Sequence, residues 1–142
     1  MFMLKRCVVT VVAMLALCLH VSAQVLRDSA NAVVAKVEID GTIRGTNRMM
    51  IGRIDRNGNM RNHNYRLIGR FKSNGDVVDM KRQKIGYVSD DGSVFDGKDD
   101  FLGRLEADGT VRDAGNVIIG YAKDVPLRYV AMYYFLDVLE YH

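Results

Sequence analysis

The 142-residue sequence is poor in the residue types from which most catalytic and metal sites are built. It has no tryptophan, one proline, two cysteines and three histidines. Both cysteines, Cys7 and Cys18, fall in the first 23 residues, so the rest of the chain has neither a disulfide nor a thiolate nucleophile. Beyond that point only His63 and His142 remain, and no spacing assembles a metal cluster or a nucleophile with its base. We therefore expect no enzyme, no metal site and no cofactor.

Long apolar runs are also missing, except near the start of the chain. Lys5 and Arg6 precede an apolar stretch of about 13 residues, and small residues at 21–23 offer a cleavage site before Gln24. This pattern predicts a signal peptide over residues 1–23. The stretch is shorter than the roughly 18 to 20 residues that cross a bilayer, and no later segment reaches that length without charges. We expect no transmembrane span and export to the periplasm or the extracellular space.

The chain lacks an excess of charge of one sign. Removal of Lys5 and Arg6 lowers the count of Lys and Arg from 20 to 18, against 17 Asp and Glu, so the formal net charge falls from +3 to +1. A balance this close to neutral gives no reason to expect nucleic acid as a partner. The length suits one repeat domain over residues 24–124, followed by a tail over 125–142.

What the sequence has instead is a repeat of 17 residues, marked by two sets of glycines. The first set is Gly52, Gly69, Gly86, Gly103 and Gly120, with Ala35 in the same place of the earliest copy, and the second set is Gly41, Gly58, Gly75, Gly92 and Gly109. The five units are 35–51, 52–68, 69–85, 86–102 and 103–119, and a sixth begins at Gly120. A fixed period of this kind predicts copies of one supersecondary unit that share a core.

Each unit has the pattern of two strands around a tight turn. Asn-Gly or Asp-Gly between alternating residues is a strong hairpin signal. A two-residue loop would place Met60 across from Asp55, whereas a three-residue loop that ends in a left-handed glycine pairs apolar with apolar residues in every copy. This register gives the core pairs Val37–Ile43, Ile54–Met60, Phe71–Val77, Val88–Val94 and Leu105–Val111. On the opposite face it gives Lys36–Arg44, Arg53–Arg61, Arg70–Val78, Tyr87–Phe95 and Arg104–Arg112.

The glycines of the first set follow the residue that opens each strand. Gly52 and its equivalents place no side chain toward the core, so we expect backbones to approach closely there, near a crowded centre.

The recurring IGR or IGY followed by NG or DG, the final IGYAKDVP and the aromatic-rich tail resemble the four-fold beta flower proteins of Bacteroides-like bacteria. The resemblance covers about residues 35–140. It implies a radial set of β-hairpins with a C-terminal helix and brings no assigned activity or functional residues. The five glycine-marked units leave open whether four or five of them close the ring.

The tail changes to a helical period after Asp124. Asp124 is suited to cap a helix, Pro126 fits a first turn, and apolar residues then recur at helical spacing, which predicts a helix over about 126–140. Because this helix is apolar almost all round, it needs partners on two sides. It is either a plug for the core of the domain or an interface for a protein partner or a second copy. The candidate interface residues are Tyr129, Tyr133, Phe135 and Leu136.

The face opposite the core is basic and aromatic. Its candidate ligand-binding residues are Arg53, Arg70, Tyr87, Arg104, Arg112 and Tyr121. Arginine binds phosphate or acidic glycans through charge-assisted hydrogen bonds, and tyrosine stacks on sugar rings. The structural alternative is a solvated charged face, neutralised by Asp55, Asp79, Asp96 and Asp113, with aromatic pairs that stabilise the sheet.

The Asp and Asn of the turns have a structural explanation. A calcium loop needs a distal bidentate Glu at a fixed offset, which these turns lack, and Asp and Asn favour tight turns without any ion.

These patterns predict an all-β radial array of hairpins with one C-terminal α-helix. We expect a non-catalytic binding or structural module of a bacterial envelope that acts through protein or self interaction. The alternatives are binding of an anionic ligand or glycan on the Arg and Tyr face, and an envelope hydrolase that uses a pair of carboxylates.

Overall fold

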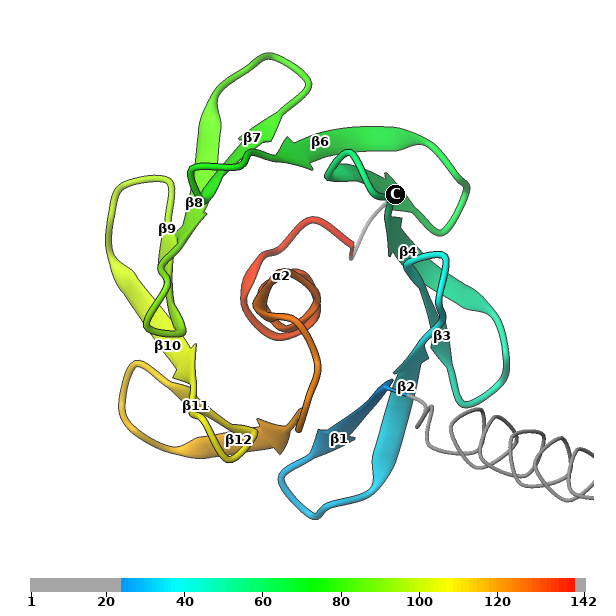
Figure 1. Ribbon diagram of the computed structural model, residues 1–142, viewed down its shortest axis with the longest axis vertical. Helices are drawn as coiled ribbons and strands as arrows, with labels where there is room; N and C mark the ends of the chain where they lie inside the picture. The colour runs from blue at the N-terminus through cyan, green and yellow to red at the C-terminus, as the bar shows by residue number, and fades with distance from the viewer. Residues whose placement is uncertain (1–23, 140–142) are drawn as a thin grey trace, which may run out of the picture.

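The computed structural model describes residues 24–139, and the predicted signal peptide over 1–23 lies outside the described residues. The described chain forms a closed barrel of twelve antiparallel strands around a C-terminal helical segment (Figure 1). Each strand pairs with its neighbours in sequence, and β1 pairs with β12 to close the ring. The predicted all-β array of hairpins with one C-terminal helix is confirmed.

The strands are short and evenly spaced along the chain. They are β1 (Gln24–Asp28), β2 (Val33–Val37), β3 (Thr42–Gly45), β4 (Met50–Ile54), β5 (Asn59–Asn62), β6 (Leu67–Phe71), β7 (Asp76–Asp79), β8 (Lys84–Val88), β9 (Ser93–Asp96), β10 (Phe101–Leu105), β11 (Thr110–Asp113) and β12 (Ile118–Tyr121). The helical segment is α2 (Leu127–Val130) followed directly by the π-helical turn η1 (Ala131–Phe135).

The register of the hairpins is the one that a three-residue loop predicts. Val37 lies across from Ile43 and Lys36 across from Arg44, and the equivalent pairs recur in every glycine-marked hairpin. The apolar pairs point inward, where they are buried or packed against the buried core. The charged and aromatic pairs therefore lie on the outer wall.

The loops at the second set of glycines are called glycine turns here. They are 39–41, 56–58, 73–75, 90–92 and 107–109. In the first, the Glu38 N–H donates to the Thr42 carbonyl at 2.8 Å and the Gly41 N–H donates to the Glu38 carbonyl at 3.0 Å. The glycines have φ between 83° and 96°, the left-handed region that the prediction requires.

Each glycine turn also binds the next hairpin. The Gly41 carbonyl accepts a hydrogen bond of 3.0 Å from the Ile54 N–H, and the same bond recurs at the other four turns at 2.7–2.9 Å. A Cβ on Gly41 would lie 1.8 Å from the Ile54 carbonyl oxygen. Glycine is thus required here by the neighbouring strand as well as by the turn.

The connections at the other end of the strands are called outer turns here, and they form the petals of Figure 1. They are 29–31, 46–48, 63–65, 80–82, 97–99 and 114–116. Their third residue is also left-handed, with φ of 63–66°, but it is Asn31, Arg48, Tyr65, Arg82, Asp99 or Asn116. All six residues are exposed, so a side chain is tolerated there.

Turn carboxylates serve the backbone, as the turn interpretation predicts. Asp79 Oδ1 accepts hydrogen bonds from the Lys81 N–H at 2.8 Å and the Gln83 N–H at 3.0 Å, and Asp113 repeats this pattern with Gly115 and Val117.

The helical segment lies in the centre of the ring (Figure 1) and is shorter than the predicted helix over 126–140. Pro126 is its N-cap and makes no side-chain capping bond, and Asp124 adopts a left-handed φ of 62°, so the expected cap by Asp124 is wrong. The helical segment ends at Phe135, because Leu136 is extended. No helix within residues 24–139 is long and apolar enough to cross a membrane.

Glycines of the first set make room for this central segment. A Cβ on Gly120 would lie 2.6 Å from Tyr134 Cε1, and one on Gly103 would lie 2.4 Å from Phe135 Cε1. Gly86 and Gly52 stand in the same relation to Leu136 and Leu139, at 2.8 and 2.6 Å. The predicted close approach of backbones is found at Gly69, Gly103 and Gly120, where a Cβ would lie 2.2–2.4 Å from a carbonyl oxygen of the neighbouring strand. Side chains of the tail add close contacts at Gly52, Gly86, Gly103 and Gly120, and they extend the core of the barrel.

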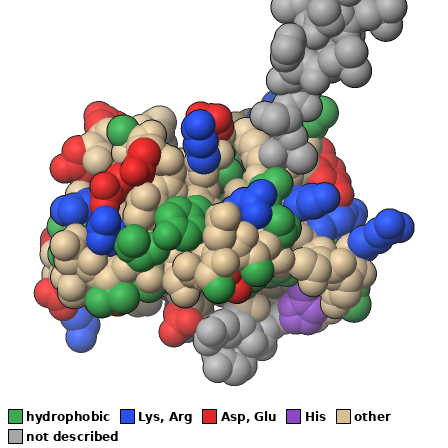
Figure 2. Space-filling view, turned by 90° about the horizontal axis from the view of Figure 1, so that it is seen from below, with side chains coloured by type: hydrophobic (Ala, Val, Ile, Leu, Met, Phe, Trp, Pro, Cys, Tyr) green, Lys and Arg blue, Asp and Glu red, His purple; other side chains and the backbone are tan. Residues whose placement is uncertain are grey.

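Seen edge-on, the ring is a flattened body whose wall carries small groups of both charges between apolar side chains (Figure 2).

Candidate functional site

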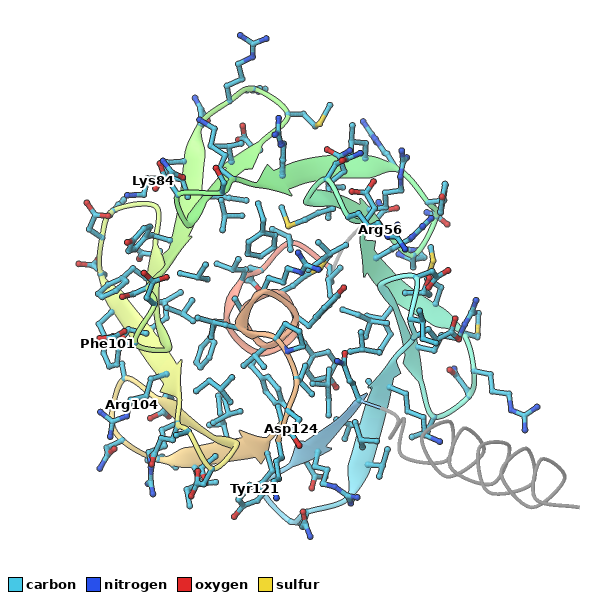
Figure 3. All side chains as sticks on the ribbon, in the orientation of Figure 1. Arg56, Lys84, Phe101, Arg104, Tyr121 and Asp124 are labelled. Atoms are coloured by element: carbon cyan, nitrogen blue, oxygen red, sulfur yellow. The ribbon has the colours of Figure 1, made fainter. Side chains whose placement is uncertain are left out.

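Of the six predicted ligand-binding residues, Arg70 and Tyr87 line one cleft, and the other four lie elsewhere on the wall. Five of the six, Arg53, Arg70, Tyr87, Arg104 and Tyr121, occupy the same position in successive units, on β4, β6, β8, β10 and β12. A radial repeat places equivalent residues at intervals around the wall, and Figure 3 shows Arg104 and Tyr121 at separate places on it. Only Arg104 and Arg112 face each other directly, across β10 and β11.

Several of these arginines are already engaged. Arg104 and Arg112 both pair with Glu106, the former at 4.0 Å, and Arg112 Nη1 donates to the Asn116 carbonyl at 3.0 Å. Arg53 donates to the Tyr65 hydroxyl at 2.5 Å. These three arginines therefore already have hydrogen-bond acceptors or ion-pair partners within the protein.

The acidic partners are not the four that the repeat suggested. Asp55, Asp79, Asp96 and Asp113 hold backbone N–H groups of the turns, whereas the ion pairs within 4.0 Å use Glu38, Asp76, Asp99 and Glu106.

One part of the rim gathers cations without a matching number of carboxylates. An open cleft of about 660 Å³, called the rim cleft here, lies over the glycine turns 56–58 and 73–75 and the start of α2. Its charged lining residues are Arg56, Arg70, Lys72 and Arg128, against Asp90 alone. Within the described chain, the side chains of Arg56, Arg70 and Lys72 form no hydrogen bond or ion pair. A site of this composition attracts anions.

Arg128 is held at the inner side of the rim cleft. Its guanidinium lies 5.2 Å from the centre of the Tyr129 ring, and Nη2 donates weakly to the Tyr129 hydroxyl at 3.5 Å. Tyr129 in turn donates to the Ile54 carbonyl at 3.4 Å, which ties this pair to the wall. The buried Nε–H of Arg128 has no acceptor among the described residues. A buried donor on a cation is costly unless an acceptor is supplied.

Tyr87 connects the rim cleft to a row of aromatic rings on the outer wall. The row, called the aromatic row here, consists of Tyr87 on β8, Phe95 on β9 and Phe101 on β10. The ring centres are 6.0 Å and then 5.8 Å apart. The Lys84 ammonium lies 5.3 Å from the centre of the Tyr87 ring. Apolar surface and cations thus adjoin at one edge of the rim cleft.

The sequence analysis missed four residues of this region, Arg56, Lys72, Phe101 and Arg128. Arg56 and Lys72 are at or beside glycine turns of different units, and the repeat alone does not show that adjacent turns share a cleft with the tail. The sequence did offer a signal, because a cation precedes the Asn-Gly pair of both turns: Arg56 lies directly before Asn57, and Lys72 lies two residues before Asn74.

Comparison with known proteins identifies the family. The family model described as "5-fold beta-flower protein" matches residues 23–137. The chain belongs to the 5-fold beta-flower family. The five glycine turns of this beta-flower protein agree with that description, so the four-fold count of the resemblance is wrong. Strands β1 and β12, from the two ends of the repeat domain, pair to complete the ring. No curated protein and no solved structure matches the chain.

The predicted interface residues of the beta-flower protein lie inside the barrel to differing degrees. Tyr129 and Leu136 are buried, with exposed fractions of 5% and 7%, and Tyr133 and Phe135 are partly buried against the core. The helix therefore fills the domain, and an interface through these residues stays a prediction.

Metal ligands do not gather in the described part of this beta-flower protein. Within residues 24–139 there is no group of three or more His, Cys, Asp or Glu side chains that could hold a metal ion.

Proposed function

We propose that this beta-flower protein is an exported, non-catalytic binding module of a bacterial envelope, and that it holds an anionic ligand in the rim cleft. The observation that carries the proposal is the composition of this cleft, which has four cationic side chains and one carboxylate.

Three of the four cations of the rim cleft have no partner within the described chain. Each exposed charge at Arg56, Arg70 and Lys72 is hydrated in the free protein, so holding the three near one another costs only repulsion, which salt reduces. An anion between them removes this repulsion and gains charge-assisted hydrogen bonds. Arg128 adds a buried Nε–H that needs an acceptor. The four groups together favour a ligand with more than one anionic oxygen.

The other functions have less support. An interface on the helix needs Tyr129 and Leu136 at the surface, but both are buried. A hydrolase needs a carboxylate pair in a cleft, and the rim cleft has Asp90 alone. Of the arginines in the predicted anion face, Arg53, Arg104 and Arg112 have partners within the protein, whereas Arg70 lines the rim cleft.

The first test uses the chain from Gln24 onward and inorganic pyrophosphate as the probe. Titration followed by backbone and arginine side-chain NMR should move the signals of 56–58, 72–75 and Arg128. Arg70→Gln with Lys72→Gln should weaken binding by about tenfold or more, because two charge-assisted bonds are lost.

The matched control is Lys81→Gln with Arg82→Gln, in the outer turn at the far end of β7. It removes the same two charges from the same part of the ring, so it changes the long-range field equally. Equal losses in both variants, or shifts spread over all the lysines and arginines, would mean diffuse attraction and would overturn the site.

Export has its own test. The full chain, expressed in a bacterium and separated into cell fractions, should appear outside the cytoplasm and begin at Gln24. An intact N-terminus in the cytoplasmic fraction would contradict the proposal.

A further inference from the structure

We infer that the ligand of the rim cleft is an acidic saccharide, with its anionic group among the cations of the cleft and its sugar rings against the aromatic row. This inference rests on the proposed function and names the chemical class that the site would take. It combines two features of the structure that the anion proposal leaves apart, the cleft and the row of rings that begins at its edge.

The aromatic row is continuous with the rim cleft. Tyr87 lines the cleft and is the first of three rings, whose centres are 6.0 and 5.8 Å apart. Each interval is comparable to the length of one pyranose unit in a chain. The row ends at Phe101, whose exposed fraction is 38% and which lies on the outer wall between Lys84 and Arg104 (Figure 3). A chain of sugars that starts in the cleft can therefore continue along the wall.

The rings are not coplanar. Tyr87 and Phe95 are inclined by 36°, and Phe95 and Phe101 by 60°. A flat, crystalline polysaccharide needs a flat platform, whereas a soluble oligosaccharide can twist to follow inclined rings. The inclination therefore favours a short or flexible chain of sugars. Phe101 is the most exposed of the three rings, so it offers the principal stacking surface.

Polar groups flank the row as hydroxyl recognition requires. Lys84 and Asp99 pair at 2.8 Å beside Tyr87, and Arg104 Nη2 donates to Asn116 Oδ1 at 3.2 Å beyond Phe101. Such groups can donate to and accept from vicinal hydroxyls at the edges of a sugar whose face lies on a ring. An aromatic row of this kind, apolar in the middle and polar at both sides, suits an amphipathic ring better than a purely apolar ligand.

The experiment uses the chain from Gln24 onward with a panel of short oligosaccharides. The panel contains uronic-acid, sulfated and phosphorylated members, each with its neutral counterpart, and inorganic pyrophosphate as an anion without rings. At least one acidic member should bind about tenfold more tightly than its neutral counterpart, because the charge-assisted bonds of the cleft are lost without the anionic group.

Variants then separate the two halves of the site. Phe101→Leu keeps an apolar side chain but removes the aromatic face, and should weaken the best saccharide by about three- to tenfold while leaving pyrophosphate unchanged. Arg70→Gln with Lys72→Gln should weaken both probes. Tyr65→Leu is the control, since Tyr65 is an aromatic residue with an exposed fraction of 51% on another part of the wall. It should leave both probes unchanged.

The outcomes distinguish the two proposals. If pyrophosphate binds at the cleft but no acidic saccharide binds more tightly than its neutral form, the saccharide inference fails and the anion site stands. The same conclusion follows if Phe101→Leu leaves saccharide affinity unchanged. If neither probe binds in the rim cleft, the proposed function fails, and the inference fails with it.

Discussion

Leu136 Cδ2 lies 2.8 Å from the position that a Cβ on Gly86 would occupy, so the tail occupies space that the wall leaves empty. The same relation holds between Phe135 and Gly103 and between Tyr134 and Gly120. At Gly52 and Gly86 the closest atom is a side chain of the tail, whereas at the other three glycines of the first set it is a carbonyl oxygen of the neighbouring strand. Wall and tail together therefore exclude a side chain at these positions, and they form one core.

This relation predicts non-additive stability in a double-mutant cycle. Gly86→Ala should cost about 1–3 kcal/mol, because the new methyl meets Leu136 Cδ2 at 2.8 Å and the Phe95 carbonyl oxygen at 3.2 Å. Leu136→Ala should cost about 2–5 kcal/mol by leaving a cavity. In the double variant the methyl enters space that leucine vacated, so urea unfolding should show a loss smaller than the sum by about 0.5–3 kcal/mol.

Gly115→Ala is the control for this cycle, because a Cβ there meets Asp113 Oδ1 at an ordinary 3.4 Å and nothing else within 4 Å. It should change the unfolding free energy by less than about 0.5 kcal/mol. Additive losses at 86 and 136 would show that the tail does not depend on the glycines.

Glycine turns and outer turns should differ in whether their third residue tolerates a side chain. Gly75 and Arg82 are each the third, left-handed residue of a three-residue turn, with φ of 96° and 63°. A Cβ on Gly75 would lie 2.4 Å from the Val88 carbonyl oxygen, so Gly75→Asn should cost more than about 2 kcal/mol. Arg82→Asn should be neutral or stabilise by up to about 1 kcal/mol, because Asn accepts this conformation more readily.

Thermal unfolding of the two variants checks this prediction. If Gly75→Asn cost no more than Arg82→Asn, the contact to the next hairpin would not be the reason for glycine at position 75.

Most of the wall could be predicted from the sequence because its determinants are local and repeated. The pairing of Ile54 with Met60 tests loop length within one hairpin, and the same test succeeds in the other four. The end of the helix could not be predicted this way. Leu136 leaves helical geometry and packs on Gly86, a residue far along the chain that no local pattern connects with it.

The candidate site was predicted only in part, for a related reason: Arg70 and Tyr87 of the rim cleft were among the predicted residues, but its other cations were not. Arg53, Arg70 and Arg104 share one repeat position, and a ring separates equivalent positions instead of gathering them. The residues that do meet in the rim cleft, such as Lys72 and Arg128, belong to non-equivalent segments. Their proximity depends on how neighbouring turns and the tail pack, which periodicity does not encode.

The hydroxyl of Tyr134 ties the tail to the first strand, and its removal should loosen the ring. It donates to the Arg27 carbonyl at 2.6 Å, beside the β1–β12 seam, where only two residue pairs are in register. Tyr134→Phe should lower the unfolding free energy by about 0.5–1.5 kcal/mol. Tyr133→Phe is a suitable control, because that ring also packs on the core and no hydrogen bond from its hydroxyl is found in the described chain.

Because of the raised pKa of Tyr134, we expect the stability of the protein to fall in alkali. Burial, followed by the neighbouring Tyr133, raises the pKa of Tyr134 well above its usual 10.0. Above pH 10 the unfolded chain therefore loses this proton while the folded chain retains it, and stability declines as the pH rises. Urea midpoints measured from below to above pH 10 should fall less steeply in Tyr134→Phe. Burial also raises the pKa of Tyr133, so Tyr134→Phe should keep part of the decline with pH. A decline as steep as in the parent protein would contradict the role of Tyr134.

Acid should weaken the glycine turns. The backbone N–H of Thr110 donates to Asp108 Oδ1 at 2.9 Å and, with the Thr110 hydroxyl, lowers the pKa of this carboxyl below 3.8; Ser93 does the same for Asp91. A carboxyl with a lowered folded pKa contributes its full stabilisation above the unfolded value of 3.8 and loses it as the pH falls through the folded value. From neutral pH down to about 4, these two groups should therefore leave the unfolding midpoint unchanged, and below that it should fall.

Asp91→Asn with Asp108→Asn tests this assignment. Asparagine can still accept the N–H bonds but has no charge to lose, so the variant should be less stable than the parent at neutral pH and should lose less on acidification. Asp90→Asn changes a neighbouring carboxylate that accepts no backbone hydrogen bond in the described chain, and should leave the acid slope unaltered. Asp90 lies in the same turn as Asp91 but differs from it in accepting no backbone N–H bond from the residues that the structure describes. If Asp90→Asn flattened the slope as much as the paired variant, the hydrogen bonds to Asp91 and Asp108 would not be the cause of acid sensitivity.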